Sequence, residues 1–193
     1  MMQQYLRHRF LFEELVKRDF KKKYKRTVLG MAWSLLSPLL MLLVMKLVFT
    51  QFFGRTMEHY TIYLFCGNLV FSYFNESTSQ GMTSLVNNAA IFTKVNIPKY
   101  LFLFSKNVQT LINFSLTLCI FFVFCGFDRI LFTWKFLLLL YPICLLVLFN
   151  IGVGLVLSAL YVFFRDIQYL WGIFTQILLY ASAIFYTIDH YDY

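Results

Sequence analysis

The sequence predicts an all-α, polytopic helical membrane protein, in which an amphipathic interface helix precedes about five transmembrane helices. Two observations favour this class over a soluble domain. Of the 193 residues, 60% are hydrophobic and only 13% are charged, whereas an ordinary soluble domain carries about 25% charged residues. The apolar residues also form long blocks, and a small water-soluble core could not bury that much apolar surface.

Residues 1–29 are predicted to form a cytoplasmic, basic and amphipathic segment. More than half of the 17 Lys and Arg residues precede Gly30. Within residues 10–26, apolar side chains such as Leu11 and Leu15 recur at helical spacing between charges, which is typical of a helix in the headgroup plane. Juxtamembrane basic clusters stay cytoplasmic and attract anionic lipids. No nucleic-acid recognition module accompanies this charge, so we expect anionic membrane lipids and no nucleic acid as partners.

Residues 30–193 are predicted to form one transmembrane domain. Each of its five apolar blocks is long enough to cross roughly 30 Å of hydrocarbon as a helix. The predicted spans are Gly30–Phe53, Tyr60–Ser79, Leu101–Phe127, Phe136–Phe163 and Gln168–Tyr186. With the N-terminus inside, only Arg55, Arg129 and Lys135 fall in outer loops, and this asymmetry predicts a cytoplasmic N-terminus.

Polar and small residues inside the predicted spans suggest two further features. Lys46 lies near the outer end of the first span, where it would either snorkel to the outer headgroups or serve a function, as the lining of a polar path or a contact with a partner. Gly154 and Ser158 form a small-xxx-small pair that allows close approach of another helix.

Two connections on the predicted cytoplasmic side stand out. The segment 81–100 is too long for a tight turn and too apolar for a disordered linker. Asn87 suits the cap of a short helix, and Pro98 stops or redirects the chain. We expect a short surface helix that docks on a soluble partner, with an inert interfacial helix as the alternative. The second connection is a tight turn in which Arg165 suits a helix C-terminus and Asp166 a helix N-terminus.

Four motifs follow one another along the chain. They are KRTVLGMAW (residues 25–33, followed by Leu36-Ser37-Pro38), NAAIFTKVNIPK (88–99), FRD (164–166) and AIFY (183–186). In this order they resemble the motifs of polysaccharide and polyol-phosphate ABC exporter permeases, the type-2 ABC transporter membrane subunits that export O-antigen, capsule or teichoic acid. The chain departs from the family pattern at Ile97-Pro98-Lys99, where Phe-Pro-Arg is usual, and lacks a proline at Ala183.

The resemblance implies how the chain would work. The second motif would be the coupling helix that docks on a separate ABC ATPase subunit. Two permease copies would form a homodimer in the bacterial cytoplasmic (inner) membrane and pass a lipid-linked glycan. Coupling to the ATPase is then expected at Asn88, Ile91, Thr93, Lys94, Ile97, Pro98 and Lys99. A cytoplasmic interface is expected at Lys25, Arg26, Thr27, Gly30, Trp33, Arg165 and Asp166. Family members carry a sixth span, so a chain that stops at Tyr193 is expected to be truncated.

No catalytic, metal or cofactor site is expected in this chain. The phosphate-binding pattern GxxxxGK[ST] does not occur, so ATP hydrolysis would take place on the partner subunit. The many Phe and Tyr rings could stack on the apolar faces of sugars. One rival function is a membrane-embedded acyl or glycosyl transferase, but His8, His59 and His190 lie in separate segments and form no acid–base cluster. The other rival is a permease that exports drugs or lipids.

Overall fold

The computed structural model describes residues 10–19, 21, 30–53, 59–93, 98–130, 133–182 and 184–185. All elements within these ranges are helices and none is a strand, which confirms the predicted all-α class. Residues 10–19 form a helix, called the N-terminal helix below. The elements that follow are η1 (Gly30–Ala32), α2 (Trp33–Phe53), α3 (Tyr60–Asn87), α4 (Ala89–Phe92), α5 (Tyr100–Phe127), η2 (Trp134–Leu139), α6 (Leu140–Phe163) and α7 (Ile167–Ala181).

Helices occur at all five apolar blocks, and the largest difference from the predicted limits is in α3. This helix continues to Asn87 instead of ending near Ser79. Its last turns are polar, but hydroxyls there bond back to the helix, as when Thr83 Oγ1 donates to the Ser79 carbonyl at 3.3 Å. The predicted limit near Ser79 is where the apolar part of α3 ends, and the helix itself continues as a polar helix to Asn87. The first part of the predicted coupling segment belongs to α3, and Asn87 ends this helix instead of capping the next one.

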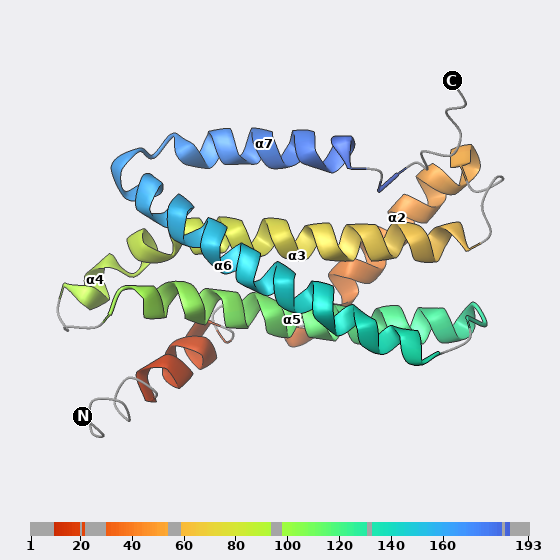
Figure 1. Ribbon diagram of the computed structural model, residues 1–193, viewed down its shortest axis with the longest axis horizontal. Helices are drawn as coiled ribbons and strands as arrows, with labels where there is room; N and C mark the ends of the chain where they lie inside the picture. The colour runs from red at the N-terminus through yellow and green to blue at the C-terminus, as the bar shows by residue number, and fades with distance from the viewer. Residues whose placement is uncertain are drawn as a thin grey trace.

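The consecutive long helices α3, α5, α6 and α7 run in alternating directions (Figure 1). Helix α3 is central and packs mainly against α5 and α6, while α2 crosses behind α3 and α5. The N-terminal helix, α4 and the turn between α6 and α7 lie at one end of the molecule. The start of α3 and the connection from α5 to η2 lie at the other end. The three segments expected on the cytoplasmic side are thus gathered at one end of the bundle.

Close approach of α3 and α6 depends on two glycines. A Cβ added to Gly81 would lie 3.3 Å from the Gly154 Cα, and one added to Gly154 would lie 3.4 Å from Leu103 Cδ1 on α5. Ser158, one turn along α6, is 3% exposed. The predicted small pair therefore does lie at a tight helix crossing, where larger side chains would push the helices apart.

Two helical segments are long and apolar enough to cross a membrane, Tyr100–Phe127 and Phe136–Phe163. A shorter apolar stretch, Trp33–Val48, lies in α2. Large apolar side chains stand exposed on these helices, as Leu148 does at 67% and Phe163 at 80%, which suits lipid or a partner helix as neighbour. The total of five spans goes beyond this finding and stays a prediction, as do both roles of Lys46, whose side chain is exposed.

Candidate functional site

A buried carboxylate fixes the N-terminal helix to α5. Asp19 is 4% exposed, although it stands in a run of Lys and Arg residues. Its Oδ1 accepts a hydrogen bond from Arg18 Nη2 at 2.7 Å, and its Oδ2 lies 2.9 Å from Lys106 Nζ. Gln109 Nε2 donates to the Asp19 backbone carbonyl at 3.2 Å. Because Lys106 and Gln109 both belong to α5, charge-assisted and neutral contacts together hold the end of the N-terminal helix on that span.

Arg18 extends this attachment to the junction between α3 and α4. The same Nη2 that binds Asp19 also donates to Asn88 Oδ1 at 2.8 Å. Asn88 is 4% exposed, and its Nδ2 donates to the Ser84 carbonyl of α3 at 2.8 Å. One guanidinium therefore bridges the N-terminal helix and the first residue of the predicted coupling motif.

An apolar contact supports the same junction. Leu15, on the inner face of the N-terminal helix, packs against Phe102 of α5, and both are buried. Leu11 and Ile91 lie partly buried around this pair. Part of the apolar stripe that was expected to face the headgroups is thus covered by protein, because the ends of α4 and α5 offer it a matching apolar surface.

The other predicted coupling residues lie near the junction with fewer contacts. The exposed Thr93 hydroxyl donates to the Ala89 carbonyl at 3.0 Å, within the last turn of α4. Pro98 is half-buried and Lys99 is exposed immediately before α5. Lys94 and Ile97 lie outside the described residues.

The residues expected at a cytoplasmic interface lie in different elements and do not form one site. Arg165 lies on the turn between α6 and α7, with its guanidinium carbon 4.9 Å from the centre of the Tyr161 ring, a cation–π contact. Asp166 occupies the N-cap of α7, but its side chain makes no capping hydrogen bond. Gly30 begins η1 with φ of 51°, a left-handed conformation that favours glycine. Lys25, Arg26 and Thr27 lie outside the described residues.

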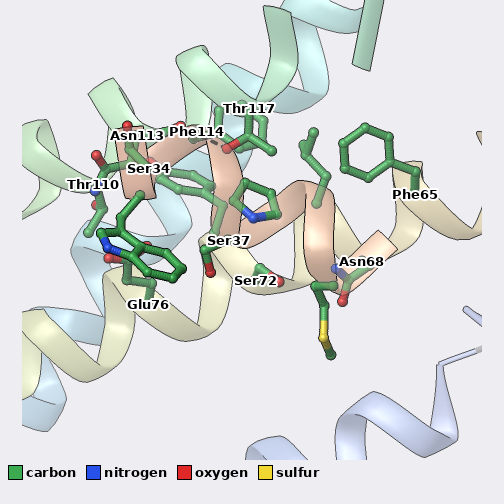
Figure 2. A pocket seen from close by; sticks show the side chains of 15 residues that line it. Ser34, Ser37, Phe65, Asn68, Ser72, Glu76, Thr110, Asn113, Phe114 and Thr117 are labelled. Carbon is green, nitrogen blue, oxygen red and sulfur yellow. Dashed lines mark hydrogen bonds between the residues drawn. The ribbon is translucent and has the colours of Figure 1, made fainter. Parts of the chain in front are cut away.

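Trp33 lines a cavity between α2, α3 and α5 (Figure 2). This cavity has a volume of about 570 Å³, which is within the range of small-molecule sites. All three helices contribute polar side chains to it. They are Ser34 and Ser37 on α2, Asn68, Ser72 and Glu76 on α3, and Thr110, Asn113 and Thr117 on α5. Aromatic rings of Phe65, Tyr73 and Phe114 complete the wall. Sequence reasoning assigned Trp33 to the cytoplasmic surface and did not anticipate the cavity.

The polar groups of the cavity differ in how they are satisfied. Thr117 Oγ1 donates to the Asn113 carbonyl at 3.0 Å, and Glu76 Oε1 accepts from Gln80 Nε2 at 2.9 Å. The side chains of Ser37, Asn68 and Ser72 make no hydrogen bond with any residue that the structure describes. Ser37 and Ser72 are exposed and Asn68 is half-buried, so water or a polar ligand in the cavity can reach these three side chains.

Sequence reasoning missed the residues that organise the junction, namely Asp19, Lys106 and Gln109. A signal for Asp19 was present, since it is the single acid within the basic run from Lys17 to Arg26. No group of three or more His, Cys, Asp or Glu residues gathers anywhere within the described ranges.

Comparison with known proteins gives the following matches. A family model described as ABC-2 type transporter matches residues 11–193. The O-antigen export system permease protein RfbA of Myxococcus xanthus is 27% identical over 191 residues, which cover 98% of this chain and 73% of the relative. An RfbA protein of Klebsiella pneumoniae is 28% identical over 186 residues, covering 93% of this chain and 71% of the relative.

Proposed function

Because this chain belongs to the ABC-2 type transporter family, we propose that it is the permease subunit of an ATP-driven exporter that moves a polysaccharide across the bacterial cytoplasmic membrane. The observation that carries the proposal is the family match over residues 11–193, which includes all the long helices. Relatives that bear the name of O-antigen export permeases support a glycan as cargo. Lipid-linked O-antigen, capsular polysaccharide and teichoic acid are the cargoes within this proposal.

The exporter would take its energy from a separate ATPase subunit, because the chain has no GxxxxGK[ST] loop. We assign docking of that subunit to residues 88–99. The contacts of Asn88 support this assignment, since a force applied at the start of α4 would reach α3 through the backbone and the N-terminal helix through Arg18. Rigid-body movement of this kind is a common way to pass a switch from a soluble partner to spans.

The end of the bundle that holds the N-terminal helix, α4 and the α6–α7 turn would face the cytoplasm (Figure 1). The concentration of Lys and Arg before Gly30 supports this orientation. Exposed apolar faces on α2 and α7, with Leu47 at 65% and Ile177 at 63% exposure, offer surface to a second copy of the chain as well as to lipid.

Charge reversal tests the docking assignment. Replacing Lys94 and Lys99 together by Glu should weaken co-purification with the co-expressed ATPase, while membrane insertion is unchanged. The matched control reverses Arg129 and Lys135, the same number of charges at the opposite end of the bundle, and should leave co-purification intact. Equal retention of the ATPase by both double variants would contradict docking at residues 88–99.

Cargo is tested in cells. A strain without this permease should lose its surface polysaccharide and accumulate lipid-linked polymer in the cytoplasm, and re-expression of the chain with its ATPase should restore the surface polymer. A strain that keeps normal surface polysaccharide but becomes sensitive to drugs would overturn the glycan assignment in favour of drug export.

A further inference from the structure

A layer of uncharged polar side chains crosses the middle of the bundle between α3, α5 and α6. Its members are Tyr73 and Ser77 on α3, Asn107 on α5 and Asn150 on α6, and none of them is more than 3% exposed. Asn150 lies about 15 Å from the start of α6 and about 20 Å from its end, at a rise of 1.5 Å per residue. Buried polar groups are normally bonded to protein or to ordered water, so each polar atom of this layer needs a partner.

The contact between α3 and α5 within the layer is direct. Ser77 Oγ donates a hydrogen bond to Asn107 Oδ1 at 2.6 Å, and Asn107 Nδ2 donates to the Leu103 carbonyl at 3.1 Å. A serine hydroxyl has one hydrogen to donate, and Ser77 uses it in this bond. The hydroxyl of Ser77 therefore cannot also donate to the neighbouring Asn150.

The contact between α3 and α6 is incomplete. Neither Oδ1 nor Nδ2 of Asn150 has a hydrogen-bond partner among the described residues. The Tyr73 hydroxyl also lacks one, although it lies beside Asn150 and Ser77. One turn further along, a Cβ added to Gly81 would lie 3.3 Å from the Gly154 Cα, so α3 and α6 are already in close contact there and cannot move closer. Since unpaired buried polar groups are costly, a small polar ligand is needed between the two helices.

We propose that Tyr73 and Asn150 bind internal water, which joins α6 to α3 across the middle of the bundle. Water suits the three unpaired groups, because it accepts hydrogen bonds from the tyrosine O–H and the amide N–H and donates one to the amide oxygen. A cation would pair only with the oxygens and would leave these donors without a partner. The Tyr73 ring also borders the cavity between α2, α3 and α5, which gives water a route to the layer.

This inference goes beyond the proposed function, because it concerns how two spans are held together and involves neither cargo nor ATPase. A direct bond between two side chains fixes one arrangement of the helices. Water bridges two polar groups nearly as well as a direct bond and is attached to neither helix. It would therefore keep the polar groups of both helices paired if α6 shifts by a small distance along α3.

Hydroxyl-radical footprinting of the full-length protein in lipid nanodiscs tests for the water directly. Radicals that an X-ray pulse forms from bound water oxidise the side chain beside that water, even when the side chain is buried. Tyr73 should be oxidised several-fold faster than Tyr60, the matched control. Tyr60 is a tyrosine of the same helix at 4% exposure, and its hydroxyl donates to the Phe185 carbonyl at 2.9 Å. Equally slow oxidation of the two tyrosines would overturn the proposal.

Two variants distinguish the bridging water from water in the cavity, which Tyr73 also borders. Asn150→Leu should slow the oxidation of Tyr73 several-fold, because it removes the amide that holds the bridging water. Asn68→Leu makes the same change at a residue that lines the cavity, and it should leave the oxidation of Tyr73 near the rate of the parent protein. Unchanged oxidation in the Asn150→Leu protein, or equal slowing by both variants, would overturn the bridge.

Thermal unfolding of the purified protein separates a water bridge from a dry layer. Tyr73→Phe and Asn150→Leu should each lower the unfolding midpoint, and the double variant should lower it by less than the sum, because both changes remove one bridge. Tyr141→Phe, at a tyrosine that is 71% exposed, should leave the midpoint unchanged. Unchanged or raised midpoints would indicate dry, unpaired groups, and additive losses would indicate independent side chains. Coupled losses without fast oxidation of Tyr73 would indicate a direct hydrogen bond. Each of these three results would overturn the proposal.

Discussion

Replacing Asp19 by Asn should release the N-terminal helix from α5. The carboxylate holds two cations, Lys106 Nζ at 2.9 Å and Arg18 Nη2 at 2.7 Å. The Lys106 side chain is 18% exposed and that of Asp19 is 3% exposed, so this pair is little screened by water. Asp19 Oδ2 accepts no hydrogen bond, so its contact with Lys106 is a charge attraction, whereas the hydrogen bond from Arg18 to a charged acceptor is of the kind that contributes about 1.5–3 kcal/mol. Asparagine keeps the shape of the side chain and one acceptor atom, and the contact with the more exposed Arg18 contributes less than the contact with Lys106. We therefore expect the docking of the N-terminal helix on α5 to lose about 2 kcal/mol.

A loss of about 2 kcal/mol increases the undocked population of the helix roughly 30-fold, because 1.4 kcal/mol corresponds to a factor of ten. Hydrogen–deuterium exchange of the peptide that contains residues 10–19 measures this population directly. The control is Glu14→Gln in the same helix. It removes the pair with Lys17, whose atoms lie 3.4 Å apart on side chains that are 53% and 63% exposed, and exposed pairs of this kind contribute little.

The reasoning would be refuted if Asp19→Asn and Glu14→Gln left the helix equally protected. A double-mutant cycle makes the test more specific. Lys106→Gln should have a similar effect alone, and the double variant should be only slightly worse than either single one, because both changes remove one interaction. Additive effects would mean that the two side chains act independently.

Two packing predictions complete the set. Gly154→Leu should lower the free energy of unfolding of the purified protein by about 1–3 kcal/mol through overpacking, because a Cβ added there would lie 3.4 Å from Leu103 Cδ1 on α5 and 3.8 Å from the Gly81 Cα on α3. Gly152→Leu should be close to neutral, since its Cβ would meet nothing within 4 Å; equal destabilisation by both would contradict the α3–α6 crossing. Ser77→Ala should cost about 1 kcal/mol, because Ser77 Oγ donates to Asn107 Oδ1 on α5 at 2.6 Å. Ser79→Ala should lower the free energy of unfolding by less, because the Ser79 hydroxyl makes a long bond of 3.4 Å to Asn75 within α3. If both serine variants shifted the unfolding transition equally, the interhelical bond between Ser77 and Asn107 would be contradicted.

The helices themselves could be predicted because lipid imposes a simple rule. A chain in hydrocarbon must pair its own backbone, so long apolar blocks become helices, and the small pair of Gly154 and Ser158 permits one of their crossings. The end of α3 could not be predicted in this way. Its last turns are polar, and hydropathy cannot distinguish a polar helix that leaves the membrane from a loop.

The junction was only partly predictable. The motif that includes Asn88 lies at this junction, but Asp19 and Lys106 are far apart in the chain and pair only through the tertiary fold. Nothing in local composition links them. The sequence does show that Asp19 is the single acid in a basic segment, which indicates that its carboxylate has a partner elsewhere in the chain.

The cavity could have been found from spacing. Asn68, Ser72 and Glu76 follow one another four residues apart, which places them on one face of α3. Thr110, Asn113 and Thr117 form a similar stripe on α5. Each stripe interrupts an apolar block in a regular way, so a search for polar periodicity within spans would reveal it. Which stripes face one another depends on packing and could not be deduced.

The shared guanidinium of Arg18 has a mechanical consequence. A single planar group contacts both Asp19 and Asn88, so the N-terminal helix cannot tilt without pulling on the start of α4. The N-terminal helix and α4 would therefore move together, with the apolar contact between Leu15 and Phe102 beside them. A force on the N-terminal helix and a force on α4 would thus oppose or reinforce each other through one side chain.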